Sequence, residues 1–153
     1  MEDLSLHILD VVENSIEANA SKIVIKIIEE KSKDSLVIEI KDNGRGMNRE
    51  TINKVLDPFY TTRTTRKVGL GLSFLAQAAK ESNGNFEIYS KVGEGTEVKA
   101  TFQYSHIDRK PIGNMNDTIV TLIISHPEIN FIYEYRDEEG SCVLDSKEIM
   151  KET

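Results

Sequence analysis

The sequence has little cysteine and no long apolar run. Its single cysteine, Cys142, excludes an intramolecular disulfide and a metal site built from several cysteines. One thiol is typical of a reducing compartment, so we expect a cytoplasmic protein. No apolar run approaches the roughly 20 residues of a membrane-spanning helix. The acidic start, Met1-Glu2-Asp3, lacks the pattern of an export signal. We therefore expect no membrane association.

Basic residues are also fewer than acidic residues. The chain has 19 Lys and Arg residues against 26 Asp and Glu residues, which gives a formal net charge of −7. This charge opposes non-specific binding to the phosphates of DNA or RNA, so nucleic acid is not an expected partner. The length of 153 residues suits one domain with a real core, alone or with an appendage.

Apolar periodicity predicts alternating helices and hairpins in the first two thirds of the chain. Helical spacing predicts a helix over residues 4–18 and a helix that carries residues 74–79. Asn48 is expected to cap a short helix that ends at residue 56. Alternation of apolar and polar residues predicts one hairpin from strands 21–30 and 35–41, and a second from strands 85–91 and 96–104.

The last third of the chain has a different pattern. Residues 106–116 contain Pro111 and Gly113 and are typical of a linker. Residues 117–125 fit a helix or a strand, and we favour a helix. A hairpin is expected at 131–135 and 141–144, followed by a helix that begins near Asp145. We therefore predict a domain at 1–105, a linker at 106–116 and a C-terminal extension at 117–153, packed on or beside the domain.

A glycine-rich turn follows the predicted strand 35–41. Its sequence is Asp42-Asn43-Gly44-Arg45-Gly46-Met47. Glycine permits positive φ and lets a flat ligand lie against bare backbone, and a carboxylate at the strand end can accept a hydrogen bond from an amino group. An ordinary turn has the same composition, so the hexapeptide alone does not separate the two interpretations.

A second glycine pair follows a polar stretch. Residues 59–67 are basic and rich in hydroxyls, and we expect a mobile loop there. Val68-Gly69-Leu70-Gly71-Leu72 then enters a helix, and backbone N–H groups at a helix N-terminus suit a phosphate. The spacing excludes a P-loop, and Phe74 stands where a dinucleotide fingerprint has its third glycine.

Acidic residues and an asparagine share one stripe of the first predicted helix. Asp10, Glu13, Asn14 and Glu17 are spaced so that they are neighbours on a helix surface. Such a stripe is ordinarily a solvated face.

These segments, taken in order, resemble the GHKL or Bergerat-fold ATPases, which include gyrase, heat-shock chaperones, histidine kinases and mismatch-repair ATPases. The similar segments are the N box (13–18), the first glycine box (42–47), the F box (57–63), and the second and third glycine boxes (68–72 and 93–96). The resemblance implies an α+β fold, a two-layer α/β sandwich with a mixed, mostly antiparallel sheet and helices on one face. A small C-terminal helix-hairpin-helix appendage would be added to it.

The resemblance also implies ATP and Mg²⁺ as ligands. It gives Asn14 the role of the one protein ligand to the metal, while Asp42 reads the amino group of adenine with support from Thr96. Gly44 and Gly46 would leave room for the base. The other expected nucleotide contacts are Met47, Thr62, Arg63, Lys67, Gly69, Leu70, Gly71 and Leu72. An equal alternative for the basic residues of this loop is that they lie on a solvated lid and do not contact the nucleotide.

The position of the family's catalytic glutamate holds Asp10, which is shorter by one methylene. A general base must come within about 3 Å of its proton or act through one water, so Asp10 is a candidate base or only orders the metal's waters. The chain is then a stand-alone histidine kinase-like ATPase that hydrolyses ATP or transfers phosphate to a partner protein. The alternative is a non-catalytic, ATP-regulated switch that binds another protein. Either form is compatible with a homodimer.

Overall fold

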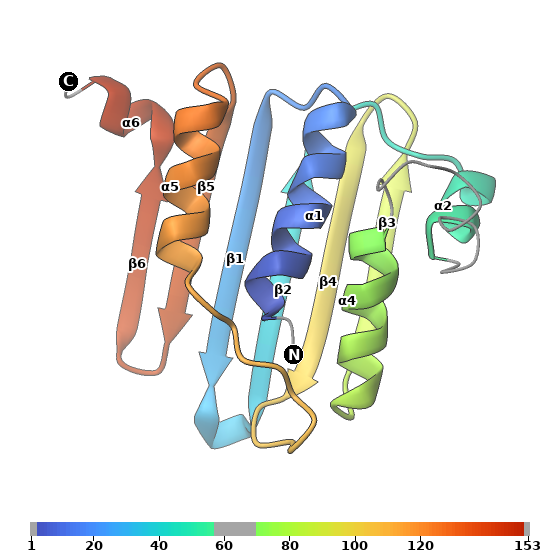
Figure 1. Ribbon diagram of the computed structural model, residues 1–153, viewed down its shortest axis with the longest axis vertical. Helices are drawn as coiled ribbons and strands as arrows, with labels where there is room; N and C mark the ends of the chain where they lie inside the picture. Colours follow the sequence, from blue (N-terminus) through green and yellow to red (C-terminus); the bar gives the residue numbers. More distant parts are fainter. Residues whose placement is uncertain (1–2, 57–69, 152–153) are drawn as a thin grey trace.

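The computed structural model describes residues 3–56 and 70–151, and its strands form one six-stranded sheet (Figure 1). The spatial order is β3-β4-β2-β1-β5-β6. The strands are β1 (Lys22–Glu30), β2 (Ser35–Asp42), β3 (Asn85–Lys91), β4 (Gly95–Gln103), β5 (Asn130–Asp137) and β6 (Gly140–Asp145). The helices are α1 (Leu4–Glu17), α2 (Arg49–Leu56), α4 (Leu70–Glu81), α5 (Met115–Ser125) and α6 (Ser146–Lys151), with a 3-10 turn at Lys31–Lys33.

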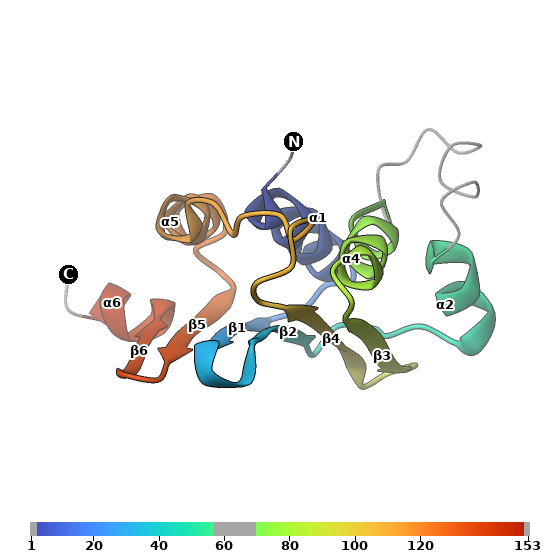
Figure 2. The ribbon, with the colours of Figure 1, turned by 90° about the horizontal axis from the view of Figure 1, so that it is seen from below.

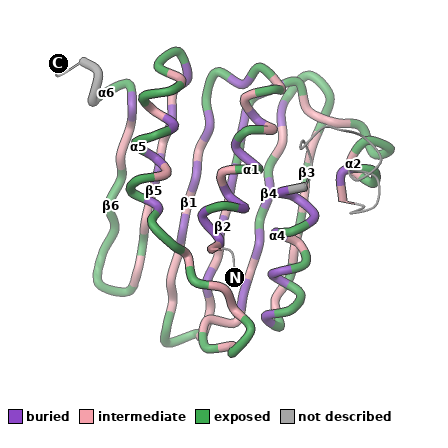
Figure 3. The backbone as a smooth tube through the Cα atoms, viewed as in Figure 1, coloured by how far each residue is buried: buried purple, intermediate pink, exposed green. Residues whose placement is uncertain are grey.

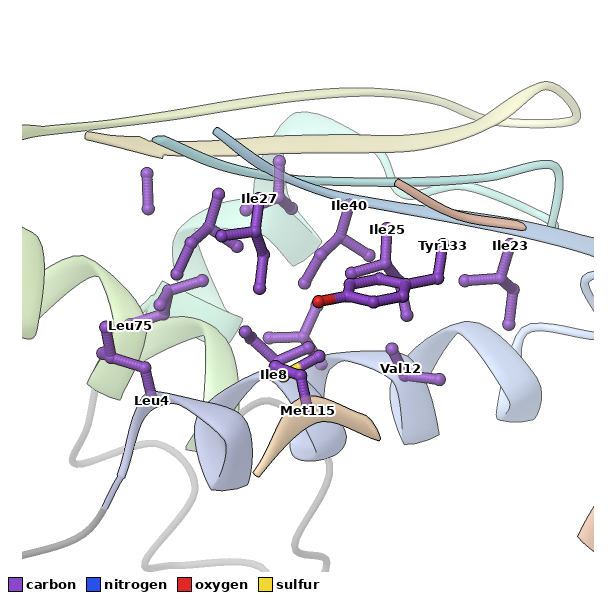
Figure 4. Close-up of a cluster of buried hydrophobic side chains, with 14 of the residues drawn as sticks. Leu4, Ile8, Val12, Ile23, Ile25, Ile27, Ile40, Leu75, Met115 and Tyr133 are labelled. Atoms are coloured by element: carbon purple, nitrogen blue, oxygen red, sulfur yellow. The ribbon is translucent and has the colours of Figure 1, made fainter. Parts of the chain in front are cut away.

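Helices α1, α4 and α5 cover the same face of the sheet (Figure 2). The alternation in β1 turns Ile23, Ile25 and Ile27 toward these helices, and all three are fully buried. Leu4 and Ile8 of α1 pack against them from the opposite layer (Figure 4). Figure 3 shows buried stretches along α1, α4 and the central strands. The predicted two-layer α+β architecture is therefore confirmed.

The other face of the sheet carries charged side chains, because the same alternation turns them away from the core. The register places Lys26 of β1 directly across from Glu39 of β2, and Glu39 across from Lys99 of β4. Opposite charges on neighbouring strands stabilise a sheet and keep its exposed face solvated. A second layer of helices on this face is therefore unnecessary.

The C-terminal elements occur in the predicted order, and they extend the same sheet. Strand β5 pairs in parallel with β1, with Ile23 opposite Phe131, and β6 pairs antiparallel with β5. The apolar run is a helix, α5, but it begins at Met115, inside the predicted linker. The side chain of Asn114 caps it by accepting a hydrogen bond from the N–H of Asp117 at 3.0 Å. The division at 105 and 116 stays a prediction.

None of the helices in the described ranges is long and apolar enough to cross a membrane.

The shared sheet predicts that α5 belongs to the same cooperative unit as α1. Ile119 and Ile124 both lie on α5, 1% and 74% exposed respectively. Ile119→Ala should lower the free energy of unfolding by about 2–5 kcal/mol, because it leaves a cavity in the core. The matched control, Ile124→Ala, should change it little. Urea unfolding followed by circular dichroism should show one transition for each variant, and a separate early transition confined to Ile119→Ala would contradict a common core.

Candidate functional site

A cavity of about 340 Å³ lies between α1 and the sheet, beside α2 and the start of α4. Its volume is in the range that holds small-molecule ligands. The apolar lining residues include Val11, Ile40, Val55, Leu72 and Val98. The polar ones include Asn14, Ser15, Asp42, Thr51 and Thr96. An apolar hollow with a few polar groups is the usual form of a site that binds a flat, partly polar molecule.

Asp42 is the buried acid of this cavity. It is the last residue of β2 and is 9% exposed. The hydroxyl of Ser15, on α1, donates to its Oδ2 at 2.6 Å, and the N–H of Gly44 donates to its Oδ1 at 2.9 Å. A buried carboxylate requires such donors to offset its lost hydration. Each carboxylate oxygen has a second lone pair, so Asp42 can still accept from a ligand in the cavity.

Thr96 lies next to Asp42 because the register of β2 and β4 pairs these two residues. Its hydroxyl is 2.7 Å from that of Ser90, which also accepts from the N–H of Met47 and lies 3.1 Å from the carbonyl oxygen of Gly95. When Ser90 gives its single hydrogen to that carbonyl, Thr96 must donate to Ser90. The oxygen of Thr96 then keeps lone pairs for the cavity, and Asp42 and Thr96 together present acceptors.

The motif glycines have a packing role that the sequence did not indicate. A Cβ on Gly46, which has φ of +72°, would lie 2.0 Å from the carbonyl oxygen of Lys91. A Cβ on Gly44 would lie 2.9 Å from Cβ of Ala18. The turn is therefore pressed between the end of α1 and the β3–β4 hairpin. Gly46 lines the cavity, whereas the Cβ position of Gly44 points at α1.

Gly71 brings α4 into contact with α1. A Cβ on Gly71 would lie 2.6 Å from Cβ of Asp10 and 2.9 Å from the backbone nitrogen of Val11. Asp10 is exposed and sits beside the first turn of α4, outside the lining of the cavity that the described residues form. It is one helical turn from Asn14, which does line the cavity.

The structure brings six of the predicted residues together at this cavity. Those that line the cavity are Asn14, Asp42, Gly46, Met47, Leu72 and Thr96. Leu70 begins α4. The predicted contacts at Thr62, Arg63, Lys67 and Gly69 lie outside the described residues.

Ser15 and Ser90 were missed in the sequence. Ser15 directly follows Asn14, so its helical position could have pointed to it. Ser90 lies beside Thr96 because of the register between β3 and β4, and no local sequence pattern indicates this register.

Comparison with known proteins identifies the class. The sequence pattern of the family described as "Histidine kinase-, DNA gyrase B-, and HSP90-like ATPase" matches residues 2–106. The chain belongs to this family.

Individual relatives agree with the family. A sensor protein of Shewanella frigidimarina is 31% identical over 103 residues, which cover 66% of this chain and 16% of that protein. Sporulation kinase C of Bacillus subtilis is 34% identical over 88 residues, 58% of this chain and 20% of that protein. The chain thus spans at most about a fifth of the length of these two relatives. The family match and the kinase relative together support ATP binding in a histidine kinase-like domain.

Solved structures share the fold over more of the chain. The ADP-bound MutL ATPase domain of Aquifex aeolicus has a TM-score of 0.58 and 19% identity, covering 94% of this chain and 62% of that one. The N-terminal domain of a DNA repair protein has a TM-score of 0.62 and 18% identity, covering 95% and 53%. Both matches extend beyond residue 106, where the family match ends.

The hydrogen bond from Ser15 to Asp42 generates a stability prediction. Ser15→Ala leaves one buried carboxylate oxygen without its donor, which should cost about 1–3 kcal/mol. Ser5→Ala is the matched control, because Ser5 lies on the same helix and is similarly buried, at 6% against 3% exposure. Urea unfolding of both variants measures the difference. Equal effects would mean that the bond to Asp42 adds nothing beyond the packing of a buried serine.

Proposed function

We propose that this cavity binds ATP with the adenine amino group hydrogen-bonded to Asp42. The observation that carries the proposal is the buried carboxylate, held by Ser15 and Gly44 and paired in register with Thr96. Adenine has an amino group where guanine has a carbonyl oxygen. A site that presents only acceptors there favours adenine and leaves the guanine oxygen facing a carboxylate.

Asn14 is the proposed protein ligand of Mg²⁺. Magnesium prefers oxygen ligands, keeps several waters and binds the phosphates of a nucleotide directly. The amide of Asn14 lines the cavity. Across the described ranges, no three His, Cys, Asp or Glu side chains gather into a metal site of their own. One side-chain oxygen therefore fits a cation that is carried in largely by the nucleotide. The metal would neutralise charge on the phosphates.

The phosphates are proposed to lie at the N-terminus of α4. Residues 70–72 form its first turn, where unpaired backbone N–H groups and the helix dipole favour anions. Asp10 is placed beside this turn by its contact with Gly71. We also propose phosphate contacts from Thr62, Arg63, Lys67 and Gly69, on the basis of the sequence alone.

The proposed reaction is hydrolysis of ATP or transfer of its terminal phosphate to a partner protein in the cytoplasm. Asp10 lies near the phosphate end, where a carboxylate can accept a proton from a water or a hydroxyl nucleophile. Relatives that are named as sensor proteins and a sporulation kinase support a signalling role. Because Asp10 stands outside the cavity lining, a non-catalytic switch that binds ATP and another protein is the second candidate.

Nucleotide selectivity tests the role of Asp42. The wild-type chain should bind ATP more tightly than GTP, and Asp42→Asn should weaken ATP binding about tenfold to a hundredfold by removing a charge-assisted acceptor. Asp34→Asn is the matched control, because Asp34 accepts hydrogen bonds from Gln103 and Ser105 at the other end of β2. Calorimetric titrations with Mg²⁺ measure the affinities. Equal affinities of the wild type for ATP and GTP would contradict the proposed orientation.

Phosphate release separates the two candidate functions. For an enzyme, Asp10→Asn should lower the release of labelled γ-phosphate about a hundredfold or more, as expected for a lost general base, while ATP still binds. Asn14→Ala should weaken the binding of Mg-ATP itself. Glu13→Gln, an exposed change on the same helix, is the control and should leave release unchanged. Wild-type release no faster than that of Asn14→Ala would favour the switch.

A further inference from the structure

The C-terminal hairpin has features of a docking edge that the nucleotide site does not explain. Strand β6 is the last strand of the sheet, and within residues 3–56 and 70–151 no strand pairs with its outer side. Natural edge strands are commonly protected from further pairing by lysine, proline or a bulge. The sequence of β6, Gly-Ser-Cys-Val-Leu-Asp, has no lysine or proline, and its first four residues are exposed.

An open groove of about 700 Å³ runs along the helix-side face of this hairpin, next to the start of α5. Its lining includes Ile112, Met115, Tyr133, Tyr135 and Cys142. Figure 1 shows that α5 covers β5 near one end of the strand and leaves the part toward the hairpin turn open. Burial raises the pKa of the Tyr133 and Tyr135 hydroxyls, so these rings stay uncharged at neutral pH. A strand added beside β6 would place every second side chain over this apolar groove.

The charge of residues 117–153 indicates which kind of strand can pair with β6. Residues 117–153 contain nine Asp and Glu residues and three Lys and Arg residues, so they carry −6 of the chain's net charge of −7. The turn between β5 and β6 holds three consecutive acids, at 137–139, and Asp145 ends β6. Two copies of this chain that met edge to edge would bring two such segments together, and their like charges would repel.

We propose that β6 docks an extended, basic segment of another protein by strand addition. Its backbone would pair with the free edge of β6. Apolar side chains on one face would enter the groove beside Tyr135 and Cys142, and Lys or Arg side chains on the other face would meet the hairpin acids. The surface goes beyond the nucleotide site and needs no nucleotide to form.

A defined peptide tests this proposal on the full chain. The probe is a capped peptide of alternating valine and lysine with the length of β6, six residues. In ¹⁵N-labelled protein, its addition should shift the amide signals of residues 140–143. It should protect from hydrogen exchange those of their N–H groups that point away from β5. Cys142 is the only cysteine, so the rate of its alkylation should fall in parallel. The same peptide with glutamate in place of lysine should not bind.

Matched variants separate strand addition from general attraction to an acidic protein. Val143 and Val92 are 59% and 65% exposed. Val143 lies on the edge strand β6, and Val92 lies in the turn between β3 and β4, at the other side of the sheet. Val143→Lys should weaken the peptide about fivefold, because like charges on neighbouring strands oppose pairing, whereas Val92→Lys should not. Ser141→Lys, also at an exposed position of β6, repeats the test if Val143→Lys does not fold.

Three results would overturn the proposal. The first is that Val143→Lys and Val92→Lys weaken peptide binding equally. The second is that the glutamate peptide binds as tightly as the lysine peptide. The third is that the chain sediments as a dimer which Val143→Lys converts to a monomer. The last would make a second copy the occupant. Asp42→Asn should leave peptide binding unchanged. The peptide titration therefore tests the docking edge independently of the ATP titration that tests the nucleotide proposal.

Discussion

One buried carboxylate joins the first helix to the middle of the sheet. Asp42 ends β2, and its bond from Ser15 fixes the height of α1 above the strand end where the cavity opens. An ionised group in this position is tolerable only when donors surround it. The fold therefore supplies two donors and leaves the remaining acceptor capacity directed at the cavity. The same residue links α1 to β2 and lines the cavity, so the packing of the core and the shape of the site meet at this strand end.

The glycines around the cavity follow from the same constraint. Gly44 lets the turn after Asp42 approach the end of α1, Gly46 lets it approach the β3–β4 hairpin, and Gly71 lets α4 approach α1 at Asp10. Each side chain added at these points would push apart two elements that enclose the cavity. The motif is thus required for the close packing of these elements, and the space of the cavity is a consequence of that packing.

Local signals in the sequence were sufficient for most of the elements and for several residues that line the cavity. Alternating isoleucines predicted β1 and β2, and the order of the motifs pointed to Asn14, Asp42 and Thr96. Contacts set by pairing between distant strands were not predictable in this way. The parallel pairing of β5 with β1 has no local signature, and Ser90 reaches Thr96 only because β3 and β4 are in a particular register. A linker was predicted where Asn114 in fact caps α5, because a cap and a turn use the same residue types.

The order of the sheet gives α1 a position between the two surfaces of this protein. The cavity is lined by residues of α1 and the start of α4, whereas the hairpin groove lies at the start of α5. Helix α1 contacts both α4 and α5, and it carries Asn14 and Ser15 on its cavity side. The first residues of α5 line the groove, so α1 borders the cavity and also packs against an element of the groove. The two surfaces thus share one helix of the core, while each is lined by its own set of residues.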